Sequence, residues 1–234
     1  MDNTITVQRL SINRLQLDCR KFDNQAFDHL KPSAMCKKYY YLSILLLGCS
    51  LLVTRSGFAQ TKVLSKGDAA PAFSAPASLA GSEFDFSLKN ALAKGPVVVY
   101  FYPSAYTGGC DIEAHTFAEQ KDQFTAAGAT IIGVSADDIQ RLNAFSSDPN
   151  FCAGKFPVAS DPNGKIAATY GLGFTPPKDG IKDLRGQALT HGFIPRTTFV
   201  IDKDGKIVAV FSSEVDHISP VDHVERSLAI VKTL

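Results

Sequence analysis

Two short apolar runs constrain the fold more than any other feature of this sequence. Residues 97–102 read VVVYFY and residues 130–135 read TIIGVS, and both are rich in β-branched and aromatic side chains. Uninterrupted runs of this kind predict strands that are buried on both faces of a sheet. Between them, Gly109 to Ala127 have the composition of a helix, and Gly128 offers a C-terminal stop. This order predicts parallel strands joined by a crossover helix.

Further elements continue the alternation. Ser219 can cap a closing helix, and Pro220 takes its favoured first position. We therefore expect an α/β fold with a central mixed β-sheet flanked by helices on both faces, to which the closing hairpin adds antiparallel strands. The other expected elements are a hairpin near 73–88, a helix over 137–147, a short strand over 156–160, a turn and short helix over 161–171, strands over 197–202 and 206–211, and a helix over 219–234.

A long connection interrupts this pattern at residues 171–195. The segment is rich in glycine and proline and contains no clear periodic run. Loops of this length in a compact domain are often functional, although this one could also be a solvated excursion.

The N-terminal part of the chain has the features of an export signal. Residues 39–53 form an uncharged apolar run of 15 residues, which follows Lys37 and Lys38. Because Ala59 offers a small residue for cleavage, we expect a secretory signal peptide that is cut after it. This divides the chain into an N-terminal extension with its signal, 1–59, and one domain, 60–234. The expected location is outside the cytoplasm, in a bacterial periplasm.

Three alternatives for this segment stay open. Residues 39–53 could remain as a membrane anchor, although a spanning helix needs about 20 residues. Met35 could be the true start, with residues 1–34 a mistaken extension. Finally, LLGC at 46–49 is similar to the lipid-attachment box of bacterial lipoproteins, which would place a lipid on Cys49. Membrane association is therefore expected only if this segment is retained or lipidated.

Composition excludes several classes of function. The net charge is +1 and no basic stripe is present, so no nucleic-acid partner is expected. The sequence contains no P-loop and no dinucleotide glycine signature, and we expect no cofactor. Histidines at 115, 191, 217 and 223 show no metal-ligand spacing with the cysteines, so no metal site is expected. His191 is close to Arg196 in sequence and could line a site, but a solvated loop residue is the preferred interpretation.

Cysteine usage narrows the chemistry. Of the five cysteines, only Cys110 and Cys152 lie in the expected mature domain. In an exported protein the two could form one structural disulfide. Cys110, however, follows a buried strand and occupies the first turn of the expected helix. There the backbone N–H groups and the helix dipole lower a thiol's pKa from about 8.5, which favours a reactive thiolate.

Several neighbours of this cysteine could take part. The Thr107 hydroxyl can donate to the sulfur and accept from a substrate, or it could only cap the helix. Gly108 and Gly109 allow close approach of a ligand to the backbone. Glu113 could hold the loop by hydrogen bonds or merely favour the helix start. Tyr106 could flank a pocket or only fill the core.

Together these residues resemble a known family. Pro103, Thr107 and Cys110 form the P-x-x-x-T-x-x-C signature of peroxiredoxins, the alkyl hydroperoxide reductase and thiol-specific antioxidant family. The preceding strand and RTTFVID at 196–202 also fit, and the resemblance covers roughly residues 65–234. It implies a thioredoxin-like fold and thiol-dependent reduction of hydrogen peroxide and organic hydroperoxides.

The resemblance also implies roles for individual residues. Cys110 is the expected peroxidatic nucleophile, which becomes a sulfenic acid. Thr107 and Arg196 are expected to orient and polarise the peroxide, and Pro103 to shield the thiolate from water. A guanidinium is suited to this role because negative charge develops on the departing oxygen. A thiol–disulfide oxidoreductase would instead require C-x-x-C, and here Glu113 stands at its second cysteine position.

Resemblance to one subgroup of peroxiredoxins also implies how the sulfenic acid is reduced back to a thiol. The chain resembles the bacterioferritin comigratory protein, or peroxiredoxin Q, some of whose members carry a second cysteine where this chain has His115. Others carry it on the next helix in a segment like NFCA, which places Cys152 as the resolving residue. The resemblance then implies a Cys110–Cys152 disulfide that a thioredoxin-like dithiol reduces, in a monomer or weak homodimer. Because a disulfide requires Cα atoms within about 7 Å, we expect local unwinding before it forms.

Two alternatives to a resolving role for Cys152 remain. Cys152 could be buried and inert, with a one-cysteine mechanism. The domain could also be a non-catalytic or chaperone-like module with a structural disulfide between the two cysteines. The chain departs from the subgroup in two places: Gly108 replaces a commonly found proline, and the 171–195 segment is longer.

Overall fold

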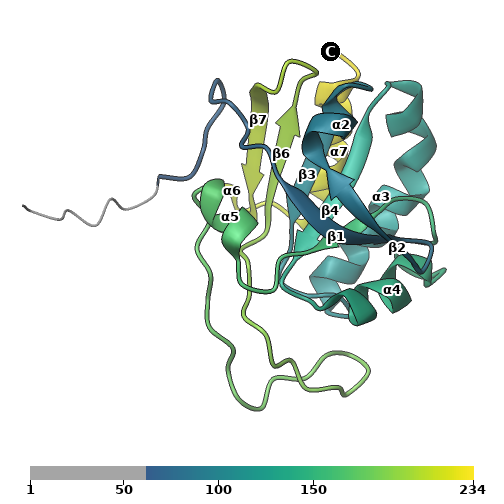
Figure 1. Ribbon diagram of the computed structural model, residues 1–234, viewed down its shortest axis with the longest axis vertical. Coiled ribbons are helices and arrows are strands. Elements are labelled where there is room, and N and C mark those ends of the chain that lie inside the picture. The colour runs from purple at the N-terminus through teal and green to yellow at the C-terminus, as the bar shows by residue number, and fades with distance from the viewer. Residues whose placement is uncertain (1–61) are drawn as a thin grey trace, which may run out of the picture. The chain divides into compact units, whose positions relative to one another are not determined.

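The computed structural model of the protein describes residues 62–234 (Figure 1). The expected signal segment, the start at Met35, the anchor at 39–53 and the lipid site at Cys49 all lie outside these residues. Within residues 62–234, no helix has the length and apolar character needed to cross a bilayer.

A seven-stranded mixed sheet forms the centre of the domain. Its spatial order is β2-β1-β5-β4-β3-β6-β7. β3, β4 and β5 are parallel neighbours, whereas β1, β2, β6 and β7 join through antiparallel pairs. The expected mixed sheet is thereby confirmed. The strands are β1 (Ser74–Leu79), β2 (Ser82–Ser87), β3 (Val97–Phe101), β4 (Thr130–Ser135), β5 (Val158–Ser160), β6 (Thr197–Ile201) and β7 (Ile207–Ser212).

Helices cover both faces of this sheet (Figure 1). One core cluster joins α3, α4 and α7 to the sheet, and a second joins α2 and α5 to the opposite face. Alternate residues of β3 enter the two clusters, as Val98 and Val99 do, which explains why the run is apolar throughout. The helices are α2 (Leu88–Leu92), α3 (Gly108–Ala126), α4 (Ile139–Ser147), α5 (Lys165–Thr169), α6 (Ser213–Asp216) and α7 (Pro220–Val231).

Local sequence signals account for the ends of the longer helices. Gly128 follows α3 with φ at +72°, a conformation that ends a helix at little cost for glycine. At α7, Ser219 and Asp222 form a capping box, and Pro220 occupies the first turn. Both predicted ends are confirmed. α2 and α6 were not expected, since 5 and 4 residues are too few to show a helical period.

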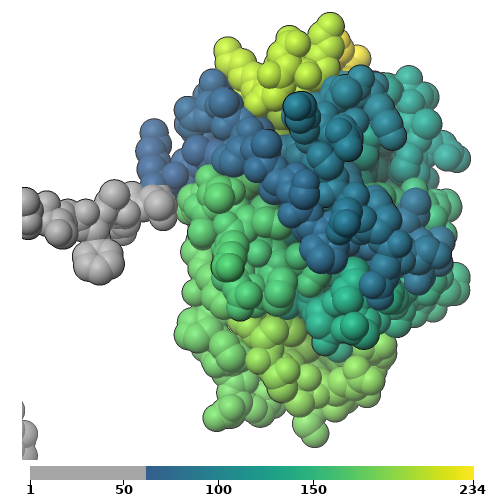
Figure 2. All heavy atoms as spheres, in the orientation of Figure 1, coloured from purple at the N-terminus to yellow at the C-terminus, as the bar shows by residue number. Residues whose placement is uncertain are grey.

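The 171–195 segment extends beyond the sheet after α5, in light green in Figure 1. Backbone bridges join Thr175 to Phe193 and Lys182 to Ala188, so the segment folds back on itself. In the space-filling view of Figure 2, the same light-green atoms continue the surface of the domain. Residues of this segment contact the loop that follows β3, as Leu184 does through its hydrogen bond to Tyr106.

Candidate active site

The candidate nucleophile lies in the helix that follows the loop after strand β3. After Phe101 the chain passes through residues 102–107 and enters α3, whose first turn holds Cys110. The Cys110 N–H donates to the Thr107 carbonyl oxygen at 2.8 Å, which closes this turn. The Cys110 side chain is only 2% exposed. The thiol thus lies at the start of a helix, as predicted, but beneath the surface.

Arg196 contacts the sulfur directly. Its Nη2 donates to Cys110 Sγ at 3.1 Å. The contact follows from strand register, because Thr197 of β6 pairs with Phe101 of β3 and Arg196 therefore lies beside the loop that follows β3. The glycine at position 109 makes room for this arginine, because a Cβ atom there would lie only 3.2 Å from Arg196 Nη2. The structure brings the two predicted residues together.

Burial and charge act in opposite directions on this thiol. Burial raises the pKa of Cys110, while the Arg196 guanidinium and hydrogen-bonding groups of Ser104 and Thr107 lower it. Burial dominates, and the pKa lies above the ordinary value for a cysteine. The sequence-based expectation of a lowered pKa was therefore wrong, since the pattern of residues shows that Cys110 lies at a helix start but not how deeply it is buried.

Glu113 holds the other side of the guanidinium. Its fully buried carboxylate accepts a hydrogen bond from Arg196 Nη1. Burial raises the pKa of Glu113 to about 7, against the lowering effect of Arg196. Sequence reasoning left this residue's role open. The available signal was its position one helical turn after Cys110, which places both side chains on one face of the helix.

A buried histidine completes this side of the site. His223 Nδ1 lies 4.0 Å from Glu113 Oε1 and 2.8 Å from Thr198 Oγ1, and its Nε2 lies 2.9 Å from Ser213 Oγ. Burial and the nearby Arg196 charge lower the pKa of His223 to about 4, so it is neutral near pH 7. Arg196 therefore remains the cationic partner that Glu113 faces.

Thr107 is the N-cap residue of α3, but its side chain makes no capping hydrogen bond. Its hydroxyl instead donates to the Ser104 carbonyl oxygen at 2.7 Å. Because the proton is used there, the oxygen lone pairs remain available to accept from a ligand. In this structure the hydroxyl proton fixes the loop, while the nearby hydroxyl also contributes to lowering the pKa of Cys110.

Cys152 lies in the turn that follows α4. Both cysteines are buried free thiols and belong to the same core cluster. Burial raises the pKa of Cys152 well above its usual value. The preceding residue, Phe151, contacts the ring of Tyr106 edge-on, with ring centroids 5.3 Å apart. Tyr106 therefore packs against the cysteine segment as well as standing in the active-site loop.

His191 has a different environment from the one expected. Its Nε2 lies 2.9 Å from Asp137 Oδ1 and 3.2 Å from Ser104 Oγ. Burial lowers the pKa of His191, but the hydrogen bond and charge of Asp137 outweigh this and raise it. Asp137 also accepts from the Ala105 N–H at 2.8 Å. His191 is thus not a solvated loop residue: it joins the long segment to the active-site loop.

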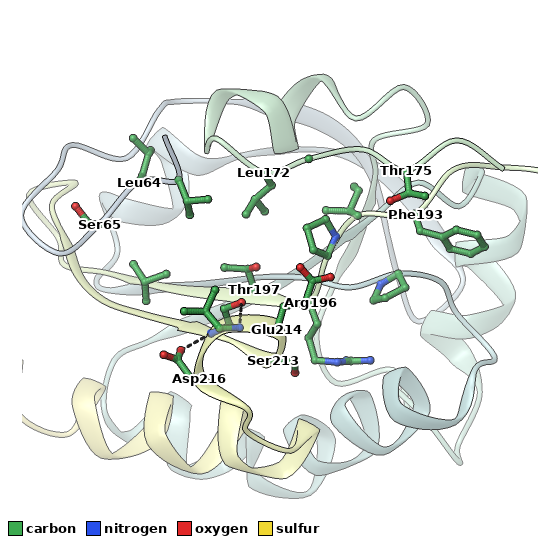
Figure 3. Close-up of a pocket in the computed structure, with 18 of the residues that line it drawn as sticks. Leu64, Ser65, Leu172, Thr175, Phe193, Arg196, Thr197, Ser213, Glu214 and Asp216 are labelled. Carbon is green, nitrogen blue, oxygen red and sulfur yellow. Dashed lines mark hydrogen bonds between the residues drawn. The ribbon is translucent and has the colours of Figure 1, made fainter. Parts of the chain in front are cut away.

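A groove of about 800 Å³ lies beside the candidate site. Pro103 and Arg196 form part of its wall, and most of its lining is apolar. Figure 3 shows Leu64 and Leu172 on one side, with Glu214 and Asp216 of α6 across from them. Within residues 62–234, no three His, Cys, Asp or Glu side chains cluster closely enough to hold a metal ion. The chemistry available here is that of a thiol, a guanidinium and nearby hydrogen-bond acceptors.

Comparison with known proteins gives a consistent result. Residues 66–210 match the model of the AhpC/TSA family. A peroxiredoxin of Mycobacterium tuberculosis is 35% identical over 147 residues, covering 63% of this chain and 84% of that protein. The crystal structure of peroxidoxin BcpB from the same organism has a TM-score of 0.59 at 31% identity, covering 73% of this chain and 98% of that chain.

A second solved structure is that of the bacterioferritin comigratory protein of Xanthomonas campestris, which has alkyl peroxide reduction activity. It has a TM-score of 0.52 at 28% identity, covering 68% of this chain and 90% of that chain.

Proposed function

Because the chain belongs to the AhpC/TSA family and is a thiol-dependent peroxidase of thioredoxin-like fold, we propose that Cys110 is the residue oxidised by the peroxide. The observation that carries this proposal is the hydrogen bond from Arg196 to Cys110 Sγ at 3.1 Å. A guanidinium in this position stabilises both the thiolate and the oxygen that leaves.

The first step balances without any further reactant. The Cys110 thiolate attacks one oxygen of the hydroperoxide, an S–O bond forms and the O–O bond breaks. The departing oxygen takes the electron pair together with the proton that the Cys110 thiol released on ionising, and it leaves as an alcohol or as water, while the sulfur keeps the attacked OH group as a sulfenic acid. We assign orientation of the peroxide to Arg196 and to the acceptor oxygen of Thr107. Pro103 limits access of water to the thiol.

The proposed substrates include organic hydroperoxides as well as hydrogen peroxide. The support is the groove, whose apolar lining adjoins Pro103 and Arg196 and could accommodate an alkyl chain. Hydrogen peroxide would need none of this surface. The two substrates should therefore respond differently to changes in the groove.

Val215→Asp is expected to raise KM for an apolar alkyl hydroperoxide roughly tenfold, with little effect on hydrogen peroxide. Val215 lines the groove and is 77% exposed, so the change adds a charge without opening the core. Steady-state kinetics with both substrates would measure the effect. Leu234→Asp is the matched control, because Leu234 is also exposed but lies outside the groove. Equal KM changes for the two peroxides would contradict the proposal that the groove binds the alkyl chain of an organic hydroperoxide.

For the second half of the cycle we propose that Cys152 resolves the sulfenic acid. Its thiol sulfur would displace the hydroxyl from Cys110, releasing water and forming a disulfide, and a thioredoxin-like dithiol would then reduce this bond. The support is the subgroup resemblance and the presence of both free thiols in one core cluster. A disulfide requires Cα atoms within about 7 Å, and we propose that the two segments rearrange to bring the sulfurs together.

Cys152→Ser is expected to leave the first oxidation intact but to block recycling by thioredoxin. Mass spectrometry after one equivalent of peroxide would show a persistent sulfenic acid in the variant and an internal disulfide in the unaltered protein. Unchanged turnover with thioredoxin would exclude Cys152 as the resolving residue and favour a one-cysteine mechanism.

We further propose that the protein is exported to a periplasm as a monomer or weak homodimer. The support for export is the apolar run at 39–53 and the small residue at Ala59, whereas the oligomeric state is carried over from the subgroup resemblance. The mass of the mature protein would locate its N-terminus and reveal any lipid on Cys49.

A further inference from the structure

We propose that Arg185, in the 171–195 segment, is a positioning residue that fastens this segment onto Tyr106. The contact restrains the rearrangement that would join Cys110 to Cys152. This inference rests on the disulfide step proposed above, in which sulfenic acid and thiol give disulfide and water. It assigns to the long segment control over how quickly that step occurs.

The segment holds Tyr106 through both side chain and backbone. The guanidinium carbon of Arg185 lies 3.1 Å from the centroid of the Tyr106 ring. A cation is attracted to an aromatic face within about 6 Å, so this contact is favourable. The N–H of Leu184 also donates to the Tyr106 carbonyl oxygen at 3.0 Å. Together these contacts tie the long segment to the active-site loop.

A buried carboxylate anchors the tip of the segment. Asp183 accepts from Arg141 Nη2 at 2.8 Å and pairs with Arg185 Nε at 3.3 Å. Arg141 Nη2 also donates to the Ala105 carbonyl oxygen at 2.8 Å. Since Arg141 belongs to α4, three parts of the chain meet here: the long segment, the active-site loop and the helix that precedes Cys152. The anchor fixes Arg185 in the orientation that places it over the ring.

Tyr106 connects the two segments that must move. Its ring packs edge-on against Phe145 and Phe151, with centroids 5.1 Å and 5.3 Å apart. Phe151 directly precedes Cys152. Tyr106 also adopts φ of +59°, a left-handed conformation that is uncommon for a bulky residue and persists only when the surroundings enforce it. Weakening the enclosure should therefore favour release of the loop.

This restraint should determine the fate of the sulfenic acid. After the first oxidation, Cys110 either forms the disulfide, which requires movement, or reacts with a second hydroperoxide. In the second case the sulfenic acid becomes a sulfinic acid and the peroxide becomes an alcohol or water, with no movement needed. A tighter contact at Tyr106 thus favours sulfinic acid, and a looser one favours the disulfide.

The test compares Arg185→Ala with the unaltered full-length protein and with Lys178→Ala. Lys178 is an exposed cation in the same segment, so its removal controls for the loss of charge. Rapid-quench mass spectrometry after one equivalent of peroxide measures sulfenic acid and disulfide as separate phases. In Arg185→Ala the rate of the second phase relative to the first should rise about fivefold, as loss of a cation–π contact allows. The yield of sulfinic acid at excess peroxide should fall.

Two further measurements separate this inference from the disulfide proposal. Hydrogen exchange of amides 104–113 in the reduced protein should accelerate in Arg185→Ala and not in Lys178→Ala, and Arg185→Lys should restore part of the protection. Equal exchange and an equal ratio of phases would overturn the role of Arg185. If no protein formed a Cys110–Cys152 disulfide, the resolving role of Cys152 would fail instead. The exchange rates would still decide whether Arg185 restrains the loop.

Discussion

Replacing Cys110 with serine is expected to abolish peroxide consumption. A serine hydroxyl is not ionised near neutral pH and cannot form a sulfenic acid, so the first step has no nucleophile. The substitution is close to isosteric in a site that is 2% exposed, and the fold should persist. Peroxide loss in a coupled assay and the thiol count after one equivalent of peroxide would both measure the effect.

The matched control is Cys152→Ser, which removes the other buried thiol of the domain. It should retain the first oxidation, whereas Cys110→Ser should lose it. If Cys110→Ser still consumed one equivalent of peroxide, Cys110 would not be the peroxidatic residue; loss of the first oxidation in Cys152→Ser as well would contradict the separate roles of the two thiols. The comparison also excludes a general effect of changing a core cysteine.

Arg196→Gln is the change with the second largest expected effect. Its guanidinium contacts the sulfur at 3.1 Å and is expected to stabilise the leaving oxygen. Removing one such preorganised donor lowers the rate by roughly 10²–10³ in well-studied enzymes, and a similar loss of kcat/KM is expected here. The pKa of Cys110 should also rise, because the Arg196 charge lowers it in the intact site. The pH profile of thiol alkylation should therefore shift to higher pH.

Glu113→Gln provides a control with the opposite sign. The amide oxygen can still accept from Arg196, but the negative charge that raises the pKa of Cys110 is lost. Alkylation should then shift to lower pH, with a much smaller loss of activity than in Arg196→Gln. Shifts in the same direction in both variants would indicate structural disturbance and would contradict the charge argument.

Much of the fold could be predicted because its signals are local. The runs at β3 and β4, the glycine after α3 and the cap of α7 each lie within a few adjacent residues. The helices α2 and α6 were missed although each begins after a serine N-cap, because five and four residues show no helical period. Likewise, Pro103, Thr107 and Cys110 belong to one short loop, so sequence spacing alone brings them together.

The remaining parts of the site depend on contacts between distant segments. The pair of Arg196 and Glu113 and the contact of His191 with Ser104 join residues separated by 83 and 87 positions. No local pattern encodes such distances. The depth of Cys110 was also hidden, since burial of the helix start depends on how the surrounding segments pack. The resemblance indicated Arg196, but the partner that holds it was visible only in three dimensions.

The antiparallel pairing of β3 with β6 has a consequence for the timing of activity. Phe101 pairs with Thr197, and the arginine that faces the thiol enters the site only through this register. A slip of one residue would turn β6 over and direct Arg196 away from the thiol. Because the partners lie 86 positions apart, this contact forms late in a chain that emerges from the ribosome. Until synthesis is almost complete, the nascent protein should therefore lack the guanidinium that lowers the pKa of Cys110 and that is expected to stabilise the leaving oxygen.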